Sequence, residues 1–286
     1  MMRLATRVAV VMVAFAANSV LNRVAVDSFG MAPLTFATLR VAAGAVTLLA
    51  LVALRGGWVP DWRARWPAAL ALTGYMTGFS LAYVRLDAGL GALILFGVIQ
   101  VVMFAVAVRR GQAVPPLRWV GAAVAMLGLA LLLWPGAGAM TVPLAGTVPM
   151  VIAGLSWAAY TLIGQGARDA LGDTAGNFVL CLPLVLAAWV VIGIADGSGG
   201  TWAWQGTTCA VIAGAVTSGL GYALWYRVLP QLATTVAGIA QLSVPVIAVA
   251  AGVAFLAEPL SARLLVTGAC VIGGIALSVL TRKPAP

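Results

Sequence analysis

The sequence has no histidine and few charged residues, which make up 8% of the 286-residue chain. Soluble domains carry roughly 25% charged residues, so this shortage argues against a soluble protein. Without histidine, the chain lacks the side chain that most often shuttles protons or binds metals. The cysteines, Cys181, Cys209 and Cys270, lie in or beside apolar runs without metal-ligand neighbours, which indicates buried thiols. No catalytic constellation is recognisable, so we expect no enzyme active site, no metal and no cofactor.

Apolar residues are abundant instead: they form 63% of the chain, and the mean hydropathy is +1.09. About 20 apolar residues cross a bilayer as a helix, so the composition predicts an all-α integral membrane protein. Glycine, proline and arginine separate ten apolar runs. The expected spans are Thr6–Leu21, Leu34–Leu54, Trp66–Val84, Ala88–Val108, Trp119–Leu133, Thr147–Gly164, Asn177–Ile194, Gly206–Tyr226, Leu232–Leu256 and Arg263–Leu280.

The two halves of the chain resemble each other. Phe15–Gly30 aligns without a gap on Trp157–Gly172, at an offset of 142 residues, which is half of the chain length. We therefore predict two five-helix repeats, residues 1–135 and 146–286. Because five is an odd number of crossings, the second repeat should be inverted relative to the first. Inverted repeats around a central cavity are typical of alternating-access transporters.

Basic residues are distributed unevenly between the two predicted membrane faces. Twelve of them fall on one face, namely Arg3, Arg7, Arg55, Arg63, Arg65, Arg109, Arg110, Arg118, Arg168, Arg227, Arg282 and Lys283, and three on the other, Arg23, Arg85 and Arg263. Because cytoplasmic loops carry the excess of Lys and Arg, both termini are predicted to be cytoplasmic. The net charge of +9 is thus attributed to topology and not to nucleic-acid binding.

Polar and aromatic side chains recur at mid-span depth, where they could line a substrate cavity. The candidates are Asn18, Tyr75, Phe79, Phe96, Gln100, Trp157, Tyr160 and Gln241. Spacings of three or four residues put several of them on shared helix faces. A buried amide without a partner costs several kcal/mol, so the amides should face protein, water or substrate. Interhelical hydrogen bonding for the amides, and packing or an interfacial belt for the rings, remain the alternatives.

Gly78, Gly97, Gly219 and Pro245 lie inside predicted spans and are candidate hinge or gating positions. Proline kinks a helix, and glycine allows bending, although close helix packing is the alternative use of these glycines.

Two charged residues have a possible role in transport. Arg40 lies early in the second span, where it either reaches the membrane surface, pairs structurally or guides a carboxylate. Its counterpart in the second repeat is Leu182, so the duplication does not require a charge there. Glu258 ends the ninth span, where a helix-end or lid ion pair with Arg263 is the alternative to a functional role.

The segment PVIAVAAGVAFLAEPLSARLLVTGACVIGGIAL, residues Pro245–Leu277, resembles the end of an EamA-type unit of the drug/metabolite transporter superfamily. Glu258 precedes Pro259 as in that pattern, while Ala257 replaces the usual glycine. TLRVAAG around Arg40 is similar to the family's Leu-Arg-Phe, and SWAAY at 156–160 resembles YddG-like amino-acid exporters. The first repeat diverges, since it has Gln100 and RRGQ where proline and glutamate are expected.

The resemblance implies a multi-pass protein of a bacterial-type inner membrane that exports amino acids, aromatic or otherwise neutral, with membrane lipid as its surroundings. Rings and amides suit a zwitterion, because an ammonium group is attracted to an aromatic face. No acidic residue falls in the middle of a predicted span, so we expect facilitated diffusion, or coupling through a peripheral acid such as Glu258. The alternatives are a proton-coupled exporter of another metabolite or drug, a lipid flippase and a membrane-embedded enzyme.

Overall fold

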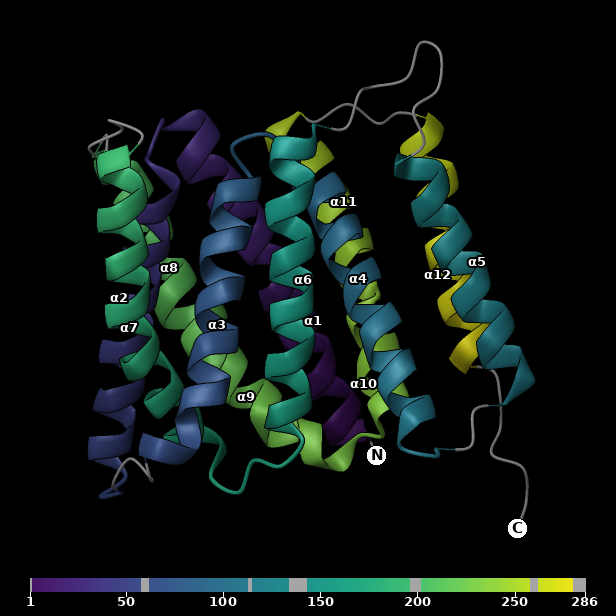
Figure 1. Cartoon of the computed structure of the whole chain (residues 1–286), viewed down its shortest axis with the longest axis horizontal. Coiled ribbons are helices and arrows are strands. Elements are labelled where there is room, and N and C mark those ends of the chain that lie inside the picture. The colour runs from purple at the N-terminus through teal and green to yellow at the C-terminus, as the bar shows by residue number, and fades with distance from the viewer. Residues whose placement is uncertain are drawn as a thin grey trace.

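The computed structural model describes residues 2–57, 62–112, 115–133, 143–195, 202–257 and 262–279, and over these residues the chain is helical without a strand (Figure 1). The elements are α1 (Met2–Arg23), the π-helical η1 (Val24–Ser28), α2 (Pro33–Leu54), α3 (Trp62–Ala82), α4 (Ala88–Arg109), α5 (Pro116–Leu133), α6 (Leu144–Gly164), α7 (Ala170–Ala195), α8 (Trp204–Ile212), the π-helical η2 (Ala213–Leu220), α9 (Gly221–Val228), the 3₁₀ turn η3 (Leu229–Gln231), α10 (Thr234–Gln241), α11 (Ser243–Leu256) and α12 (Ala262–Val279).

Seven helical segments in the described residues are long and apolar enough to cross a membrane. They are Met2–Ser28, Pro33–Leu54, Ala88–Arg109, Leu144–Gly164, Ala170–Ile192, Trp204–Gln231 and Thr234–Leu256. The remaining three helices, α3, α5 and α12, lie where the sequence predicts spans, and their crossing of the membrane stays a prediction. Large apolar side chains such as Val46, Leu155 and Val191 are exposed on the outer surface, as lipid contact requires.

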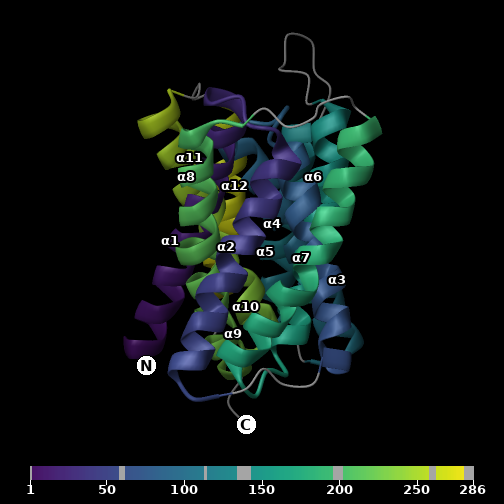
Figure 2. The ribbon, with the colours of Figure 1, turned by 90° about the vertical axis from the view of Figure 1, so that its left-hand side faces the viewer.

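The helices run roughly side by side, with their connections at two ends of the bundle (Figures 1 and 2). Side-chain bonds identify the helix termini that share an end: Arg55 after α2 pairs with Asp169 before α7, and Arg110 after α4 bonds to Gln165 after α6. We call this the arginine-rich end, and the start of α1 also lies there (Figure 1). At the opposite end, Arg23 of α1 bonds to Asp87 before α4. Successive helices therefore alternate in direction.

Packing between helices follows a regular pattern. α2 packs on α7, α4 packs on α10 and α11, and α5 packs on α12. α3 packs on α6, and α1 packs on η2 and α9. Figure 1 shows α5 and α12 as a pair at one side of the bundle, next to α4. The other helices surround one large buried core.

Two glycines allow α2 to approach its neighbours closely. A Cβ atom added to Gly214 of η2 would collide with the carbonyl oxygen of Arg40 on α2, and one added to Gly44 of α2 would collide with the ring of Phe178 on α7 and lie 3.0 Å from the carbonyl oxygen of Gly214. Backbone-to-backbone contact at this crossing therefore requires glycine. The contact lies beside Arg40. It therefore holds η2, which carries Ser218, within hydrogen-bonding distance of the Arg40 side chain.

Three features depart from regular α-helix or from the expected spans. The helix from Trp204 to Gln231 contains the π-helical η2, and the helix from Thr234 to Leu256 is interrupted at Leu242. Pro245 accounts for the interruption, because its ring clashes with the carbonyl group four residues earlier, at Gln241. α7 starts at Ala170, well before the expected start at Asn177, so Asp173 lies within the helix.

Replacing Gly214 with alanine should destabilise the protein by about 1–3 kcal/mol, because the added methyl group forces α2 and η2 apart. Gly268→Ala is the matched control, since a Cβ atom there has no neighbour within 4 Å. Thermal unfolding in detergent measures both variants. Equal melting temperatures for the two would show that the crossing is not tightly packed.

Candidate functional site

Aromatic rings from five helices fill the centre of the bundle. This ring cluster consists of Phe15, Tyr75, Phe79, Tyr83, Trp157, Tyr160, Phe178, Tyr222, Trp225 and Tyr226. The ring centroids of Tyr75 and Trp157 lie 4.6 Å apart, and Trp157 and Tyr222 are equally close. Phe15 and Trp157, which the repeat aligns, meet edge to face at 5.1 Å. The structure thus brings four of the predicted cavity residues together, and their rings pack on one another: Tyr75, Phe79, Trp157 and Tyr160.

Arg40 lies inside this cluster with no exposed surface. Its Nε donates a hydrogen bond to Ser218 Oγ at 2.8 Å, and its Nη2 donates to the hydroxyl oxygens of Tyr222 at 2.7 Å and Tyr75 at 3.4 Å. The guanidinium carbon lies 5.6 Å from the centroid of the Tyr75 ring and 5.2 Å from that of Phe79. Of the three alternatives for Arg40, the structure does not show the one in which it reaches the membrane surface, because its partners hold the side chain in the core.

Within the described residues, no acid balances the charge of Arg40. The ion pairs found within the described residues involve other arginines, and Nη1 of Arg40 is buried without a hydrogen-bond partner. A buried charge that lacks its partner costs roughly 3–5 kcal/mol. Neutral hydroxyls and ring faces recover part of this cost, and they leave the centre of the cluster positively charged.

The predicted amides have different surroundings. Asn18 Oδ1 accepts hydrogen bonds from Thr217 Oγ1 at 2.6 Å and from Ser218 Oγ at 3.1 Å. Through Ser218, Asn18 is linked to Arg40. Gln241 Oε1 accepts a 2.7 Å hydrogen bond from Trp157 Nε1. Both amides therefore form bonds between helices, as the structural alternative proposed, and both touch the ring cluster or the Arg40 network.

Gln100 and Phe96 lie on α4, away from the ring pairs. Gln100 faces Gly238 of α10, and its Oε1 is buried without a hydrogen-bond partner. Phe96 is buried in the same core, and in the described part of the chain it forms no ring pair with the cluster. The structure thus separates these two residues from the other cavity candidates.

The hinge candidates occupy different environments. A Cβ atom at Gly78 would approach the carbonyl oxygen of Pro149 to 2.6 Å, so Gly78 serves the packing of α3 on α6. Gly97 is buried within α4, and Gly219 lies in the π-helical η2. Pro245 follows the interruption at Leu242. Glu258, the other charged candidate, lies outside the described residues.

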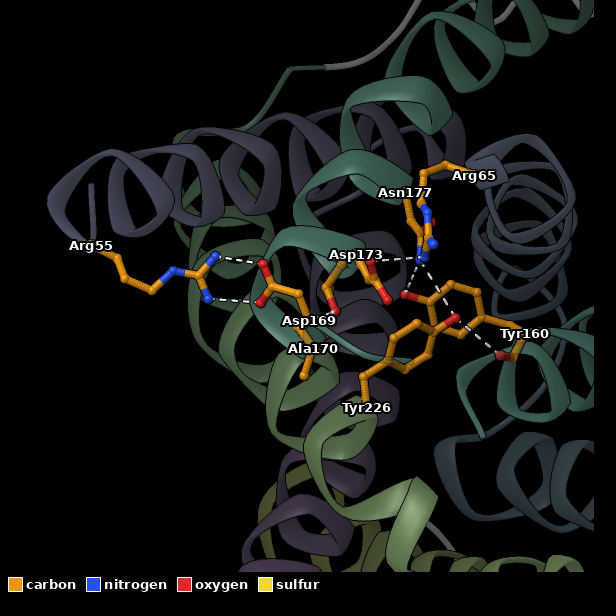
Figure 3. Close-up of polar contacts among 9 residues, drawn as sticks. Arg55, Arg65, Tyr160, Asp169, Ala170, Asp173, Asn177 and Tyr226 are labelled. Atoms are coloured by element: carbon orange, nitrogen blue, oxygen red, sulfur yellow. Dashed lines mark hydrogen bonds and ion pairs between the residues drawn. The ribbon is translucent and has the colours of Figure 1, made fainter. Parts of the chain in front are cut away.

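Ion pairs join the two halves of the chain at the arginine-rich end (Figure 3). Arg55 binds both carboxylate oxygens of Asp169, at 2.7 and 2.6 Å. Arg65 of α3 pairs with Asp173 of α7 at 3.0 Å, and the Asp173 side chain is only 4% exposed. The span expected from the sequence starts at Asn177 and leaves Asp173 outside. The observed α7 starts earlier, at Ala170, and Asp173 is buried within it.

A polar layer continues inward from Asp173. One helical turn further along α7, Asn177 Nδ2 donates to the hydroxyl oxygens of Tyr160 at 3.3 Å and Tyr226 at 3.5 Å. The Tyr226 hydroxyl donates to the backbone oxygen of Tyr160 at 3.1 Å (Figure 3). Polar groups thus extend from the arginine-rich end to the edge of the ring cluster.

A pocket of about 380 Å³ opens at the arginine-rich end, beside the ion pairs. Arg55, Asp169 and Tyr226 line it, together with the exposed Arg168 and Arg227. The hydroxyl of Tyr226 belongs to the polar layer, so the pocket and the ring cluster share this side chain. A small anionic or zwitterionic solute approaching from this end meets a surface with excess positive charge.

Several side chains of the site were not predicted from the sequence, chiefly Ser218, Tyr222, Tyr226 and Asn177. The duplication contained a signal for three of them. Tyr75 and Phe79 on α3 and Tyr83 directly after it follow each other at four-residue intervals. Adding 143 to each residue number gives Ser218, Tyr222 and Tyr226 in the second half of the chain. The four-residue spacing of these side chains along one helix face therefore recurs in the second half of the chain.

The chain is similar to a transporter family and to several known proteins. The EamA-like transporter family matches residues 144–280. An uncharacterized protein of Pseudomonas aeruginosa, PA1977, is 41% identical over 274 residues, which cover 95% of this chain and 92% of that protein. The threonine/homoserine exporter RhtA of Salmonella typhimurium is 26% identical over 260 residues, covering 87% and 82%. RhtA of Escherichia coli is 29% identical over 171 residues, covering 59% and 57%.

One solved crystal structure superposes with a TM-score of 0.72 at 19% sequence identity, over 96% of this chain and 97% of that one. At this identity the likeness concerns the fold. It extends over both halves of the chain, including the first, which the family match leaves out.

The stabilising effect of the Arg55–Asp169 ion pair should be lost only at acidic pH and should be complete near neutral pH. Hydrogen bonds from the Arg55 guanidinium hold the pKa of Asp169 below its ordinary value. Since the folded pKa is lowered, the pair stabilises the protein above the unfolded value of about 3.9 and loses its effect as pH falls through the lowered pKa. Both side chains are more than a third exposed, so we expect about 0.2–1 kcal/mol.

Thermal unfolding of the wild type and Asp169→Asn between pH 3 and 7 measures this effect. The two melting temperatures should differ at pH 7 and converge at the acidic limit, and Arg55→Gln should show the same convergence. A difference that persists undiminished at pH 3 would contradict the assignment.

Proposed function

Because the chain belongs to the EamA-like transporter family, we propose that it exports amino acids across the bacterial inner membrane. The observation that carries the proposal is the convergence of polar and aromatic side chains from α1, α3, α6, α9 and α10 at the centre of a membrane-spanning bundle. Interior hydroxyls, amides and an arginine are costly in a membrane protein and usually mark a substrate path.

An inverted duplication supports alternating access as the mechanism. Helices that the repeat makes equivalent pack on each other: α2 on α7, α4 on α10 and α11, and α5 on α12. The contacts of α3 with α6 correspond to those of η2 and α9 with α1. In this proposal a two-fold axis in the membrane plane relates such pairs. The contact of Phe15 with Trp157, which the repeat aligns, supports it. Rocking the two halves about this axis exposes the ring cluster to one side at a time.

The arginine-rich end faces the cytoplasm in this proposal, and both termini lie there. Arg55, Arg65, Arg110, Arg168 and Arg227 are found at this end, whereas Arg23 and Arg85 lie at the other. Excess Arg on the cytoplasmic side is the rule for such proteins. The 380 Å³ pocket then receives substrate from the cytoplasm, and the ion pairs of Asp169 and Asp173 close the path behind it.

Amino acids are the proposed substrates because two features agree. The RhtA relatives carry the name threonine/homoserine exporter. In the ring cluster, Trp157 and Tyr222 offer faces for an ammonium group, and Arg40 offers hydrogen-bond donors for a carboxylate. In the occluded arrangement the rings pack on each other, so the substrate must separate them as it enters.

Facilitated diffusion is the proposed energetic mode, since none of the side chains in the ring cluster or the Arg40 network is acidic. Proton-coupled export is the second candidate, and the buried carboxylate of Asp173 favours it. Protonation of Asp173 would remove its attraction to Arg65 and loosen the closure of the arginine-rich end.

Counterflow into proteoliposomes loaded with a mixture of the twenty amino acids tests the function. We expect a labelled neutral amino acid to accumulate transiently, and a pH gradient to change its initial rate less than twofold. Absence of counterflow for every amino acid would contradict the proposed substrate class. Uphill accumulation driven by the pH gradient, abolished in Asp173→Asn, would replace facilitated diffusion with proton coupling.

Substitutions in the predicted site test the path. Trp157→Ala and Tyr75→Ala should each lower the counterflow rate at least tenfold, because each removes a ring from the buried centre. Gln100→Ala should lower the rate less, because Gln100 lies on α4 away from the ring cluster. Leu155→Ala on the same helix as Trp157 is the control, as Leu155 faces outward and is half exposed. Rates equal to that of the control in all three variants would mean that these residues only pack.

A further inference from the structure

We propose that Arg40 is the anion anchor of the ring cluster, so that this protein carries only solutes with a carboxylate or similar anionic group. The substrate carboxylate binds Nη1 of Arg40 between Tyr75 and Phe79, and the amino-acid side chain extends toward the neutral rings. This inference rests on the proposed transport function and names the chemical group by which the site recognises its cargo.

The free hydrogen-bonding capacity of the guanidinium is the first observation. Nε and Nη2 have hydroxyl partners, whereas Nη1 is buried and has no hydrogen-bond partner in the described part of the chain. Guanidinium and carboxylate match in geometry and form strong charge-assisted hydrogen bonds. A donor left open in a fully buried, positively charged site therefore fits an anion that arrives with the substrate.

The Tyr75 hydroxyl provides a second donor at the same place. Its oxygen accepts from Arg40 Nη2 and from the Tyr222 hydroxyl at 3.3 Å. Its own proton has no acceptor among the described residues. A carboxylate bound to Arg40 can therefore also accept from Tyr75, so that the site offers two donors, one charged and one neutral.

A purely structural role explains Arg40 less well. The repeat-equivalent residue, Leu182, is apolar and occupies the corresponding place on α7, so the fold of a five-helix unit does not need a charge there. The bonds from Arg40 to Ser218 and Tyr222 could be made by a neutral side chain at lower desolvation cost. What only a cation adds is attraction for an anion.

Position also favours a role in recognition. Arg40 lies on α2, while its partners Ser218 and Tyr222 lie on η2 and α9 in the other half of the chain. Ser218 continues to Asn18 on α1. An anion bound to Arg40 therefore touches both halves where they meet, and neutralising the guanidinium changes the electrostatics of that junction. Substrate charge can thus favour the loaded state over the empty one.

The experiment compares L-threonine with L-threoninamide, in which the carboxylate is replaced by a neutral amide. Each unlabelled compound competes with labelled L-threonine in counterflow by wild type, Arg40→Gln and Arg40→Lys. In the wild type the amide should compete at least tenfold more weakly than the acid. In Arg40→Gln the two should compete within about threefold of each other, and Arg40→Lys should retain part of the preference.

Arg85→Gln is the matched control, because Arg85 is an exposed arginine at the opposite end of the bundle. It should keep the wild-type preference. Purified Arg40→Gln should elute as a single species with a melting temperature at or above that of wild type, since an unbalanced buried charge is removed. L-threonine should raise the melting temperature of wild type more than that of the variant, which binds it more weakly.

Each outcome decides the inference separately from the proposed function. Transport of amino acids by the wild type without a preference for the acid over the amide would overturn the anion anchor alone, and this comparison needs no variant. A wild-type preference that survives in Arg40→Gln would also overturn it. If no amino acid is transported by the wild type, the proposed function fails first.

Discussion

The burial of the Arg40 guanidinium constrains the centre of this protein. Four elements must approach closely to surround it. α2 carries the arginine, α3 brings Tyr75 and Phe79, η2 brings Ser218, and α9 brings Tyr222. The glycine contact between α2 and η2 makes the approach possible, since a methyl group at Gly214 would push the backbone of Arg40 away. Close packing, ring faces and hydroxyls together hold a charge that lipid could not solvate.

The two ends of the bundle are stabilised in different ways. At the arginine-rich end the ion pairs of Asp169 and Asp173 connect α2 and α3 to α7, thus one half of the chain to the other. At the opposite end Arg23 bonds to Asp87 and to the backbone oxygen of Tyr83, all within the first half. A relative motion of the halves must therefore break the first set of contacts and can preserve the second. Among the described residues, the ion pairs that join the two halves therefore lie at the arginine-rich end.

Much of the architecture was predictable because lipid restricts the choices. Helices arise near all ten predicted spans, since apolar runs must satisfy their backbone groups internally. The burial of Asn18, Trp157 and Gln241 was predictable for the same reason. The early start of α7 was not, because Asp173 reads as a loop residue until Arg65, far away in the sequence, is brought next to it. The position of Gln100 and Phe96 outside the ring pairs likewise depends on the rotation of α4, which its uniformly apolar sequence does not specify.

The sequence by itself determined the membrane class, the uneven distribution of arginine along the chain and the polar residues that needed partners inside, and it predicts a duplication. These properties follow from composition and local period, which each segment carries alone. Only the tertiary structure decided that Arg40 is enclosed by rings, that Tyr222 and Ser218 are its partners, and that one of its nitrogens remains open. The physical reason is that a side chain's solvation depends on neighbours from distant helices, and those neighbours are fixed by packing.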